Sequence, residues 1–221
     1  MFCECHDILV RYGRTVVLDV QRLAIPAGHI TTIVGPNGAG KTTLLEVLAL
    51  LRRPTCGQVS LWGRPAEASD RELQKKIVMV MHPGYMFHGA VWHNVMYGLR
   101  ARGTRRSESR LRAADALKMV GMSDFAHRNV VDLSAGERQR VNLARAVAIG
   151  PEAVLLDEPS ANVDTRTVAL IRNLLRRLSQ EQGTTVIHTS PGNSQLHDIA
   201  DRVVYIEAGR ILKSDERPSD N

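Results

Sequence analysis

The stretch that decides the fold is Ile30-Thr31-Thr32-Ile33-Val34-Gly35-Pro36-Asn37-Gly38-Ala39-Gly40-Lys41-Thr42-Thr43. Its first five residues are β-branched throughout, as expected of a strand that is buried on both faces. The next eight fit the pattern G-x-x-x-x-G-K-[ST] at every required position. The run from Thr42 to Leu51 is apolar on most sides and predicts a buried helix. A strand, a glycine-rich loop and a helix in this order predict a phosphate-binding loop.

Phosphate chemistry explains the residue types in this loop. Glycines let backbone N–H groups curl around phosphate oxygens, and the following helix points the positive end of its dipole at the same phosphates. Lys41 is expected to reach the β- and γ-phosphates, and the Thr42 hydroxyl is expected to hold Mg²⁺. The motif therefore predicts a nucleoside triphosphate site, with contacts from Gly35, Pro36, Asn37, Gly38, Ala39, Gly40, Lys41, Thr42 and Thr43.

A pair of carboxylates follows a second apolar strand. The run Ala153-Val-Leu-Leu156 ends in Asp157 and Glu158. A carboxylate at a buried strand end is costly unless a cation or hydrogen-bond donors satisfy it. Asp157 is therefore interpreted as an Mg²⁺ ligand that acts through water, and Glu158 as the residue that orients or deprotonates an attacking water.

The remaining pattern predicts an interrupted α/β core. Strand patterns occupy 8–12, 16–20, 59–62 and 77–81, and they return at 153–156, 184–187 and 203–206. Between them, 83–150 has a helical pattern, and an amphipathic helix with Val168, Ile171 and Leu175 on its apolar side follows the second strand group. The order predicts a core of residues 1–82 and 151–221 with an all-helical lobe at 83–150.

Composition narrows the class of protein further. The chain has 221 residues and a net charge of +6, from 29 Lys and Arg against 23 Asp and Glu. It has no apolar run near the ~18 residues that a membrane-spanning helix needs, and its first residues lack the basic start of a secretory signal. Three cysteines are too few for a disulfide scaffold. We therefore expect a cytosolic chain that does not cross a membrane alone.

The stretch Leu133-Ser134-Ala135-Gly136-Glu137 opens a helix whose apolar stripe is Val141, Ala144 and Ala148. Ser134 is a helix-capping residue type, and the small residues after it let the helix start offer N–H groups to an anion. Here the sequence resembles the nucleotide-binding subunit of ABC transporters, whose pattern is Leu-Ser-Gly-Gly-Gln. The resemblance covers essentially the whole chain.

This resemblance implies a fold and a nucleotide site. The fold would be a P-loop ATPase core with an antiparallel β subdomain and an all-helical insert lobe. Two copies would close head to tail, with each ATP held between the phosphate loop of one copy and Ser134 and Gly136 of the other. Tyr12 matches the aromatic residue that stacks on adenine, and Asp164 lies in the loop that follows the carboxylate pair.

The resemblance also implies partners and a location. Closure and ATP hydrolysis would rock separate transmembrane permease subunits that contact the helical lobe. In an importer, a periplasmic or extracellular substrate-binding protein would deliver the cargo. The chain would be a peripheral subunit at the cytoplasmic face of the inner membrane, and it would bind no nucleic acid.

Two positions depart from the family pattern. His82 stands where the family has a Gln that contacts Mg²⁺ and the attacking water, and Pro191 stands where it has a His that grips the γ-phosphate. Proline has no side-chain donor, and His188 is expected to face the opposite side of its strand. One interpretation is weakened hydrolysis, with His82 as a partial substitute. The other is that Ser190 or a water replaces the missing donor.

Three further groups have competing interpretations. The cluster Cys3-Glu-Cys5-His6 is either a soft-metal site or part of a first strand. The methionines at 79, 81, 86 and 96, with Phe87 and Trp92, are either core or a partner surface. The six arginines between 100 and 112 are either a solvated helix start or a surface for anionic lipid.

The family resemblance favours a bacterial importer. Segments 94–103 and 160–164 are similar to those of tungstate and other oxyanion importers, although the ATPase itself never touches the cargo. The length leaves no room for the extra C-terminal domain of sugar-importer ATPases. Two alternatives stay open: a near-inactive ATP-binding module that locks a partner complex, and an ABC ATPase of a non-transport complex.

Overall fold

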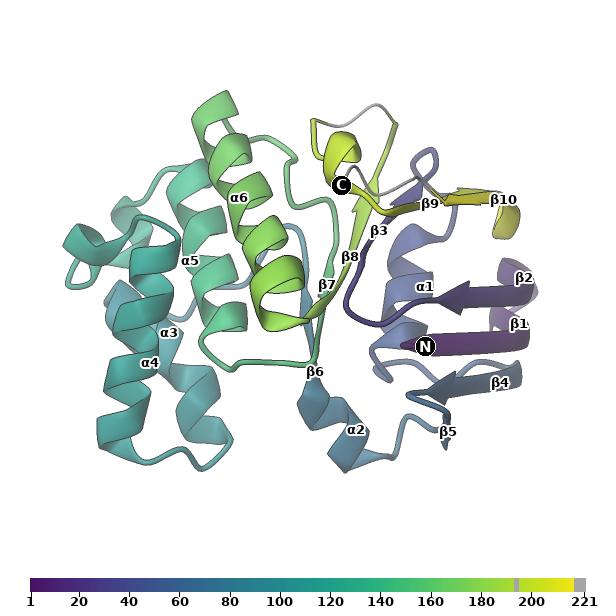
Figure 1. The fold of residues 1–221 in the computed structure, drawn as a ribbon, viewed down its shortest axis with the longest axis horizontal. Coiled ribbons are helices and arrows are strands. Elements are labelled where there is room, and N and C mark those ends of the chain that lie inside the picture. Colours follow the sequence, from purple (N-terminus) through teal and green to yellow (C-terminus); the bar gives the residue numbers. More distant parts are fainter. Residues whose placement is uncertain (193–194, 217–221) are drawn as a thin grey trace.

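The computed structural model describes residues 1–192 and 195–216, and its strands form two sheets (Figure 1). The smaller sheet is antiparallel, in the order β2-β1-β4-β5, with strands β1 (Cys3–Tyr12), β2 (Thr15–Ile25), β4 (Cys56–Leu61) and β5 (Arg64–Ala66). The larger sheet has the order β10-β9-β3-β8-β7-β6, with strands β3 (Ile30–Val34), β6 (Ile77–Val80), β7 (Ala153–Leu156), β8 (Thr185–Ser190), β9 (Arg202–Glu207) and β10 (Arg210–Glu216). Its strands are parallel except β10, which runs antiparallel to β9.

Helices connect and cover these sheets. The α-helices of the described residues are α1 (Lys41–Leu48), α2 (Arg71–Lys76), α3 (Val91–Ala101), α4 (Arg106–Met119), α5 (Ala135–Val147) and α6 (Thr165–Gln182). Short 3₁₀ turns lie at Ser123–Phe125, Val130–Asp132 and His197–Ile199. The mixed α/β architecture, with a parallel sheet and an antiparallel sheet, confirms the predicted fold class.

Both faces of the larger sheet are buried. Leu155 and Ile187 belong to a core that α1 completes between the two sheets. Their strand neighbours Val154, Leu156 and Val186 belong to a second core, which includes the apolar faces of α5 and α6. Alternate residues of one strand thus pack into opposite layers, which is why β7 is apolar throughout.

The parallel strands place the candidate site. Gly35 follows β3, Asp157 follows β7, and His82 comes two residues after β6. Because parallel strands end at the same edge of their sheet, segments that are distant in sequence meet there. In Figure 1 this edge lies beside α1.

Several predicted element ends are wrong by one to three residues. The helix predicted to run to Leu51 ends at Leu48, because Leu50 adopts a positive φ of 56° and turns the chain. The strand predicted at 59–62 begins earlier, at Cys56, and stops before Trp62, whose φ is 48°. The strand predicted to include Met81 ends at Val80, and the Met81 side chain is exposed.

Helices α3, α4 and α5 lie together on the left of Figure 1. Small side chains let α4 approach its neighbours, since Ser109, Ala113 and Ala116 are buried. Leu111 has helical spacing with Leu117 in the sequence, yet it is 68% exposed.

The lobe boundaries near residues 83 and 150 stay a prediction. Among the described residues, no helix is both long and apolar enough to span a membrane.

Candidate functional site

The loop between β3 and α1 is shaped by glycines. A Cβ on Gly35 would lie 2.1 Å from the carbonyl oxygen of Ile206, and a Cβ on Gly40 would lie 2.8 Å from that of Val17. Gly38 and Gly40 also have φ values of 79° and 96°, in the left-handed region that glycine enters without strain. Close packing as well as backbone conformation therefore requires glycine in this loop.

We expect Gly35→Ala to destabilise the chain by about 3 kcal/mol, because the added methyl meets rigid backbone rather than a flexible side chain. Urea unfolding would measure this free energy. Gly192→Ala is the matched control, since among the described residues no atom lies within 4 Å of its added Cβ. Equal unfolding free energies for the two variants would contradict the steric argument.

Lys41 is the first residue of α1, and its side chain folds back across the loop. Its ammonium Nζ donates to the carbonyl oxygens of Gly35 and Pro36, at 2.8 Å and 3.1 Å. It also lies 3.2 Å from Oε1 of Glu158. Only 5% of the side chain is exposed, so these partners compensate a buried charge. The ammonium is thus held at the loop that is predicted to bind phosphate.

The carboxylate pair is held by hydroxyl groups. The Thr42 Oγ1 donates to Asp157 Oδ2 at 2.7 Å, and the Thr189 Oγ1 donates to Asp157 Oδ1 at 2.7 Å. The backbone N–H of Glu158 donates to the same Thr189 oxygen at 2.9 Å. Asp157 is therefore bound through both of its oxygens, by groups from α1 and β8.

These residues line a cavity of about 400 Å³. Its described lining is Val17, Asn37, Gly38, Gly40, Lys41, Thr42, Thr43, His82, Asp157 and Glu158. The structure thus brings most of the predicted phosphate, Mg²⁺ and water-activating residues to one place. Gly35, Pro36 and Ala39 belong to the loop but are not among these lining residues.

The donor set fits a nucleotide phosphate with Mg²⁺. Lys41 supplies an ammonium, and the start of α1 supplies a positive dipole end. Thr42 and Asp157 offer the oxygen ligands that Mg²⁺ prefers. Because the Thr42 hydroxyl gives its proton to Asp157, its lone pairs stay available to a cation.

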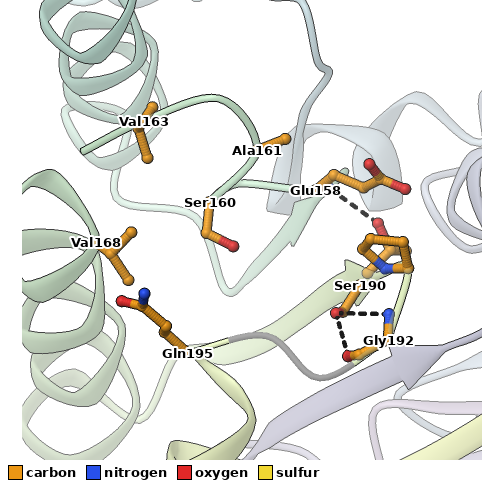
Figure 2. Close-up of a pocket in the computed structure, with 10 residues that line it drawn as sticks. Glu158, Ser160, Ala161, Val163, Val168, Ser190, Gly192 and Gln195 are labelled. Atoms are coloured by element: carbon orange, nitrogen blue, oxygen red, sulfur yellow. Dashed lines mark hydrogen bonds between the residues drawn. The ribbon is translucent and has the colours of Figure 1, made fainter. Parts of the chain in front are cut away.

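The two departures from the family pattern lie on either side of Glu158. His82 lines the 400 Å³ cavity, and its role there stays a prediction. Pro191 instead lines a neighbouring cavity of about 370 Å³. Figure 2 shows Glu158 and Ser160 on one side of this second cavity and Ser190 and Gly192 on another. The Ser190 hydroxyl donates to the carbonyl of Gly192 at 2.7 Å, so in this structure it is engaged within its own loop.

His188 is buried within the sheet and does not line either cavity. Its Nε2 is hydrogen-bonded to Thr32 Oγ1 of β3 at 2.8 Å. Burial lowers its pKa to about 4, so the imidazole is neutral near pH 7. His188 therefore does not supply the missing phosphate contact of Pro191.

The low pKa of His188 predicts a pH-dependent stability. The unfolded chain takes up a proton near pH 6.5 and the folded chain only near pH 4, so unfolding is favoured progressively as pH falls across this window. We expect a loss of about 3 kcal/mol in the free energy of unfolding from this residue. Urea unfolding of wild type and His188→Gln between pH 7.5 and 4 measures it. The exposed His127→Gln is the control, and parallel wild-type and His188→Gln profiles would contradict the prediction.

Tyr12 stands at the end of β1 and is 48% exposed. The Arg52 guanidinium lies 4.8 Å from the centre of its ring, and Arg52 Nε donates to Glu46 Oε2 at 2.5 Å. Tyr12 is not among the described residues of the 400 Å³ cavity. Stacking of adenine on this ring stays a prediction.

Ser134 and Gly136 lie at the start of α5, away from the 400 Å³ cavity. Ser134 Oγ accepts from the backbone N–H of Glu137, and a Glu137 carboxylate oxygen accepts from the N–H of Ser134 at 2.7 Å. This reciprocal cap lowers the pKa of Glu137, chiefly through the backbone bond to Ser134. A Cβ on Gly136 would lie 3.0 Å from Asp164 Oδ2, so these segments pack closely.

The cysteine cluster at 3–6 and the methionine and aromatic group lie outside the 400 Å³ cavity. Cys3 and Cys5 are buried, whereas His6 is exposed on the opposite face of β1, and no group of three His, Cys, Asp or Glu among the described residues could hold a metal ion. The methionine and aromatic group divides. Met96 is buried and Trp92 packs against the core, while Met81 is exposed and, with Met79, lines a cavity of about 250 Å³.

Sequence reasoning missed Val17 and Thr189, which contact the site through long-range pairing. It also missed the reciprocal cap of α5, although the spacing Ser134-x-x-Glu137 is a signal for it. The Glu that replaces the family Gln at this position is therefore the residue that completes the cap.

The β3–loop–α1 unit and the carboxylates after β7 define a P-loop nucleotide-binding cassette. Residues 18–161 match the family model described as ABC transporter. The chain belongs to the ABC transporter family.

Relatives with curated names include ATP-binding proteins of several import systems. The chain is 34% identical to the tungstate uptake system ATP-binding protein TupC of Peptoclostridium acidaminophilum, over 92% of this chain and 94% of that protein. It is 33% identical to the Fe(3+) ions import ATP-binding protein FbpC of Photorhabdus laumondii, over 96% of this chain and 60% of that protein. The chain thus spans about 60% of the length of the Fe(3+) relatives.

Solved structures share the fold. A dimeric post-hydrolysis structure of the ATP-binding cassette MJ0796, bound to ADP and Pi, has a TM-score of 0.88 and 28% identity. It covers 97% of this chain and 98% of that one. CbiO1 of Clostridium perfringens, part of the complex cbiONQ, has a TM-score of 0.87 and 26% identity, over 97% of this chain and 88% of that one.

Proposed function

We propose that this chain binds and hydrolyses ATP and thereby powers import through separate transmembrane subunits. The observation that carries the proposal is the cavity in which Lys41, Thr42, Asp157 and Glu158 meet. Names of relatives support it, since they are ATP-binding proteins of import systems. The cargoes that the relatives' names give differ among Fe(3+), tungstate and sulfate, so the names support an import role in general.

The geometry suggests a role for each side chain. The loop N–H groups and Lys41 bind the triphosphate, and Lys41 exchanges its ion pair with Glu158 for the phosphate oxygens. Mg²⁺ held near Thr42 and Asp157 would neutralise the charge that develops on the phosphoryl group. Glu158, once released from Lys41, accepts a proton from the attacking water or orients it. His82 is placed to contact the same region.

A second copy of the chain would complete the site. Ser134, Gly136 and Asp164 do not line the cavity that holds Lys41, so within one copy they have no access to the same phosphates. A head-to-tail dimer brings the start of α5 from one copy to the phosphate loop of the other. The dimeric MJ0796 structures support the pairing of two copies.

The exposed residues around Met81 form a surface that suits a membrane partner. Met81 and Tyr85 are exposed beside a cavity of about 250 Å³ that Gly98 and Arg145 also line. A largely apolar cavity with adaptable methionines and an arginine in its lining is suited to a short helix of a permease subunit. The chain would therefore act as a peripheral subunit at the cytoplasmic face of the membrane, with a substrate-binding protein on the other side.

An oxyanion such as tungstate is the proposed cargo, on the likeness to TupC along nearly the full length of both chains. The test is reconstitution of this chain in vesicles with the membrane and binding proteins encoded beside it. Tungstate-loaded binding protein should stimulate ATP consumption and uptake. Co-assembly with stimulation by another cargo would overturn only the oxyanion assignment. Failure to assemble with any membrane protein would overturn the transport role.

A binding module with little turnover is the second candidate. It is favoured by Pro191, by the buried His188 and by the engaged Ser190 hydroxyl, because none of the three offers a free donor to a γ-phosphate. In that case ATP closes the dimer and the closed state persists. The rate of phosphate release separates the two candidates.

A further inference from the structure

Thr189 occupies a position that links the two carboxylates of the site. It lies in β8, whose parallel pairing with β7 places Leu156 opposite His188. The residues one step further, Asp157 and Thr189, are therefore neighbours at the edge of the sheet. Thr189 is buried, with 1% of its side chain exposed.

The Thr189 hydroxyl donates one hydrogen bond and accepts another. It gives its one proton to Asp157 Oδ1 at 2.7 Å, and it accepts the backbone N–H of Glu158 at 2.9 Å. In Figure 2 the dashed line at Glu158 marks the second bond. A hydroxyl has one proton and two lone pairs, so these two bonds fix its orientation.

The bond to Glu158 falls where the backbone is strained. Glu158 has a φ of 44°, which a non-glycine residue adopts only when its surroundings compensate for the strain. This turn carries the Glu158 carboxylate to within 3.2 Å of Lys41 Nζ. The Thr189 hydroxyl thus holds the turn that aims Glu158 at the phosphate loop.

The bond to Asp157 fixes the second carboxylate. Asp157 Oδ2 is bound by Thr42, a residue proposed to contact Mg²⁺. Oδ1 is anchored by Thr189 on a different element. With both oxygens bound, the plane of the carboxylate cannot rotate away from the cation site.

We propose that Thr189 is a positioning residue that sets the Asp157 carboxylate for Mg²⁺ and the Glu158 turn for the attacking water. It touches neither the phosphates nor the cation itself, and it acts through its two neighbours. The inference rests on the proposed ATP-binding function. It predicts that loss of the hydroxyl changes the dependence of nucleotide binding on Mg²⁺.

The test compares Thr189→Val with the wild-type chain. Valine keeps the shape and removes both hydrogen bonds. Binding of a fluorescent ATP analogue is titrated with Mg²⁺, and phosphate release is measured separately. Because a hydrogen bond to a charged group is lost, we expect the Mg²⁺ concentration for half-maximal binding to rise by about 10-fold or more. Binding without Mg²⁺ should change by less than about 3-fold, because Lys41 and the loop are intact.

Two further variants separate positioning from a merely structural role. Thr31→Val is the matched control: Thr31 is buried in β3, and in the described part of the chain its Oγ1 has no hydrogen-bond partner. Thr189→Ser keeps the hydroxyl and should return the Mg²⁺ dependence to near the wild-type value. If Thr189→Val folds poorly, Thr189→Cys, with a similar volume and a weak donor, should show the same direction of change.

The outcomes are distinguishable. Folded valine and cysteine variants with wild-type Mg²⁺ dependence and phosphate release would overturn the inference and leave the proposed function standing. An equal shift in Thr31→Val would also overturn it, because any buried hydroxyl in the sheet would then have the same effect. A wild-type chain that binds no ATP would overturn the proposed function and this inference with it.

Discussion

Replacing Lys41 with methionine is expected to weaken ATP binding by about 100-fold, because charge-assisted hydrogen bonds to phosphate contribute most strongly in a buried site. The Lys41 side chain is only 5% exposed, and two loop carbonyls accept hydrogen bonds from its ammonium. Methionine keeps the length and apolar stem of lysine but has no donor. Isothermal titration with Mg-ATP measures the change in the dissociation constant.

The control for this substitution is Lys76→Met. Lys76 is half-buried and paired with Glu152 at 2.9 Å, and it is not among the cavity residues, so the variant makes the same chemical change away from the cavity. Its ATP affinity should equal that of the wild type. Lys41→Met also leaves Glu158 without its ion-pair partner, so circular dichroism must show that the variant is folded. A folded Lys41→Met chain with an affinity within 3-fold of the wild type would contradict the proposed phosphate contact.

The second large effect is expected from Glu158→Gln. The amide keeps the shape but cannot accept a proton from water, so phosphate release should fall by about 10²- to 10⁴-fold. ATP binding should persist, because Lys41, Thr42 and the loop are unchanged and one carboxylate is removed beside the phosphates. Because the bound ATP is then not hydrolysed, it should keep two copies together as a dimer. Phosphate release and the mass of the complex with Mg-ATP are the two measurements.

Glu152→Gln is the matched control, since Glu152 is an exposed carboxylate whose partner is Lys76. The Glu152→Gln variant should hydrolyse ATP at the wild-type rate, and its dimer should dissociate afterwards as the wild-type dimer does. Wild-type turnover in Glu158→Gln would refute the role of Glu158. If the wild-type chain already forms a stable dimer with ATP and releases no phosphate, the second candidate function, an ATP-binding module with little turnover, is supported instead.

Local motifs made much of the site predictable. The order of residues from Gly35 to Thr42 specifies a loop whose backbone conformation depends on glycine, and the acids after 153–156 stand at a strand end whatever the rest of the fold. Their meeting in one cavity follows from the parallel arrangement of the strands that precede them. Motif and topology are enough to place Lys41, Thr42 and Asp157 together.

The contacts that refine the site depend on register between distant strands. Thr189 reaches Asp157 only because β8 pairs with β7 in one particular register, and Val17 reaches Gly40 from the other sheet. No local pattern encodes such pairings. The end of α1 could not be predicted for a different reason. The apolar pattern continues to Leu51, although the backbone leaves the helix before Leu50.

The head-to-tail arrangement of two copies is a prediction that comes only from the family resemblance. Ser134 and Glu137 form a cap that the spacing could have predicted, and this cap orders the start of α5. Why that helix start should meet an anion cannot be derived from one copy, because the anion would lie on the other. Gly136 also packs so closely against Asp164 and Thr167 that a larger side chain there would have to displace theirs.

We propose that this chain hydrolyses ATP at a site that two copies complete. The most direct measurement is the initial rate of phosphate release from Mg-ATP by the purified chain over a range of chain concentrations. We expect the rate per chain to rise with concentration, as dimers form, and to be lost in both Lys41→Met and Glu158→Gln. An absence of phosphate release at every concentration, from a folded chain that binds ATP, would contradict this proposal.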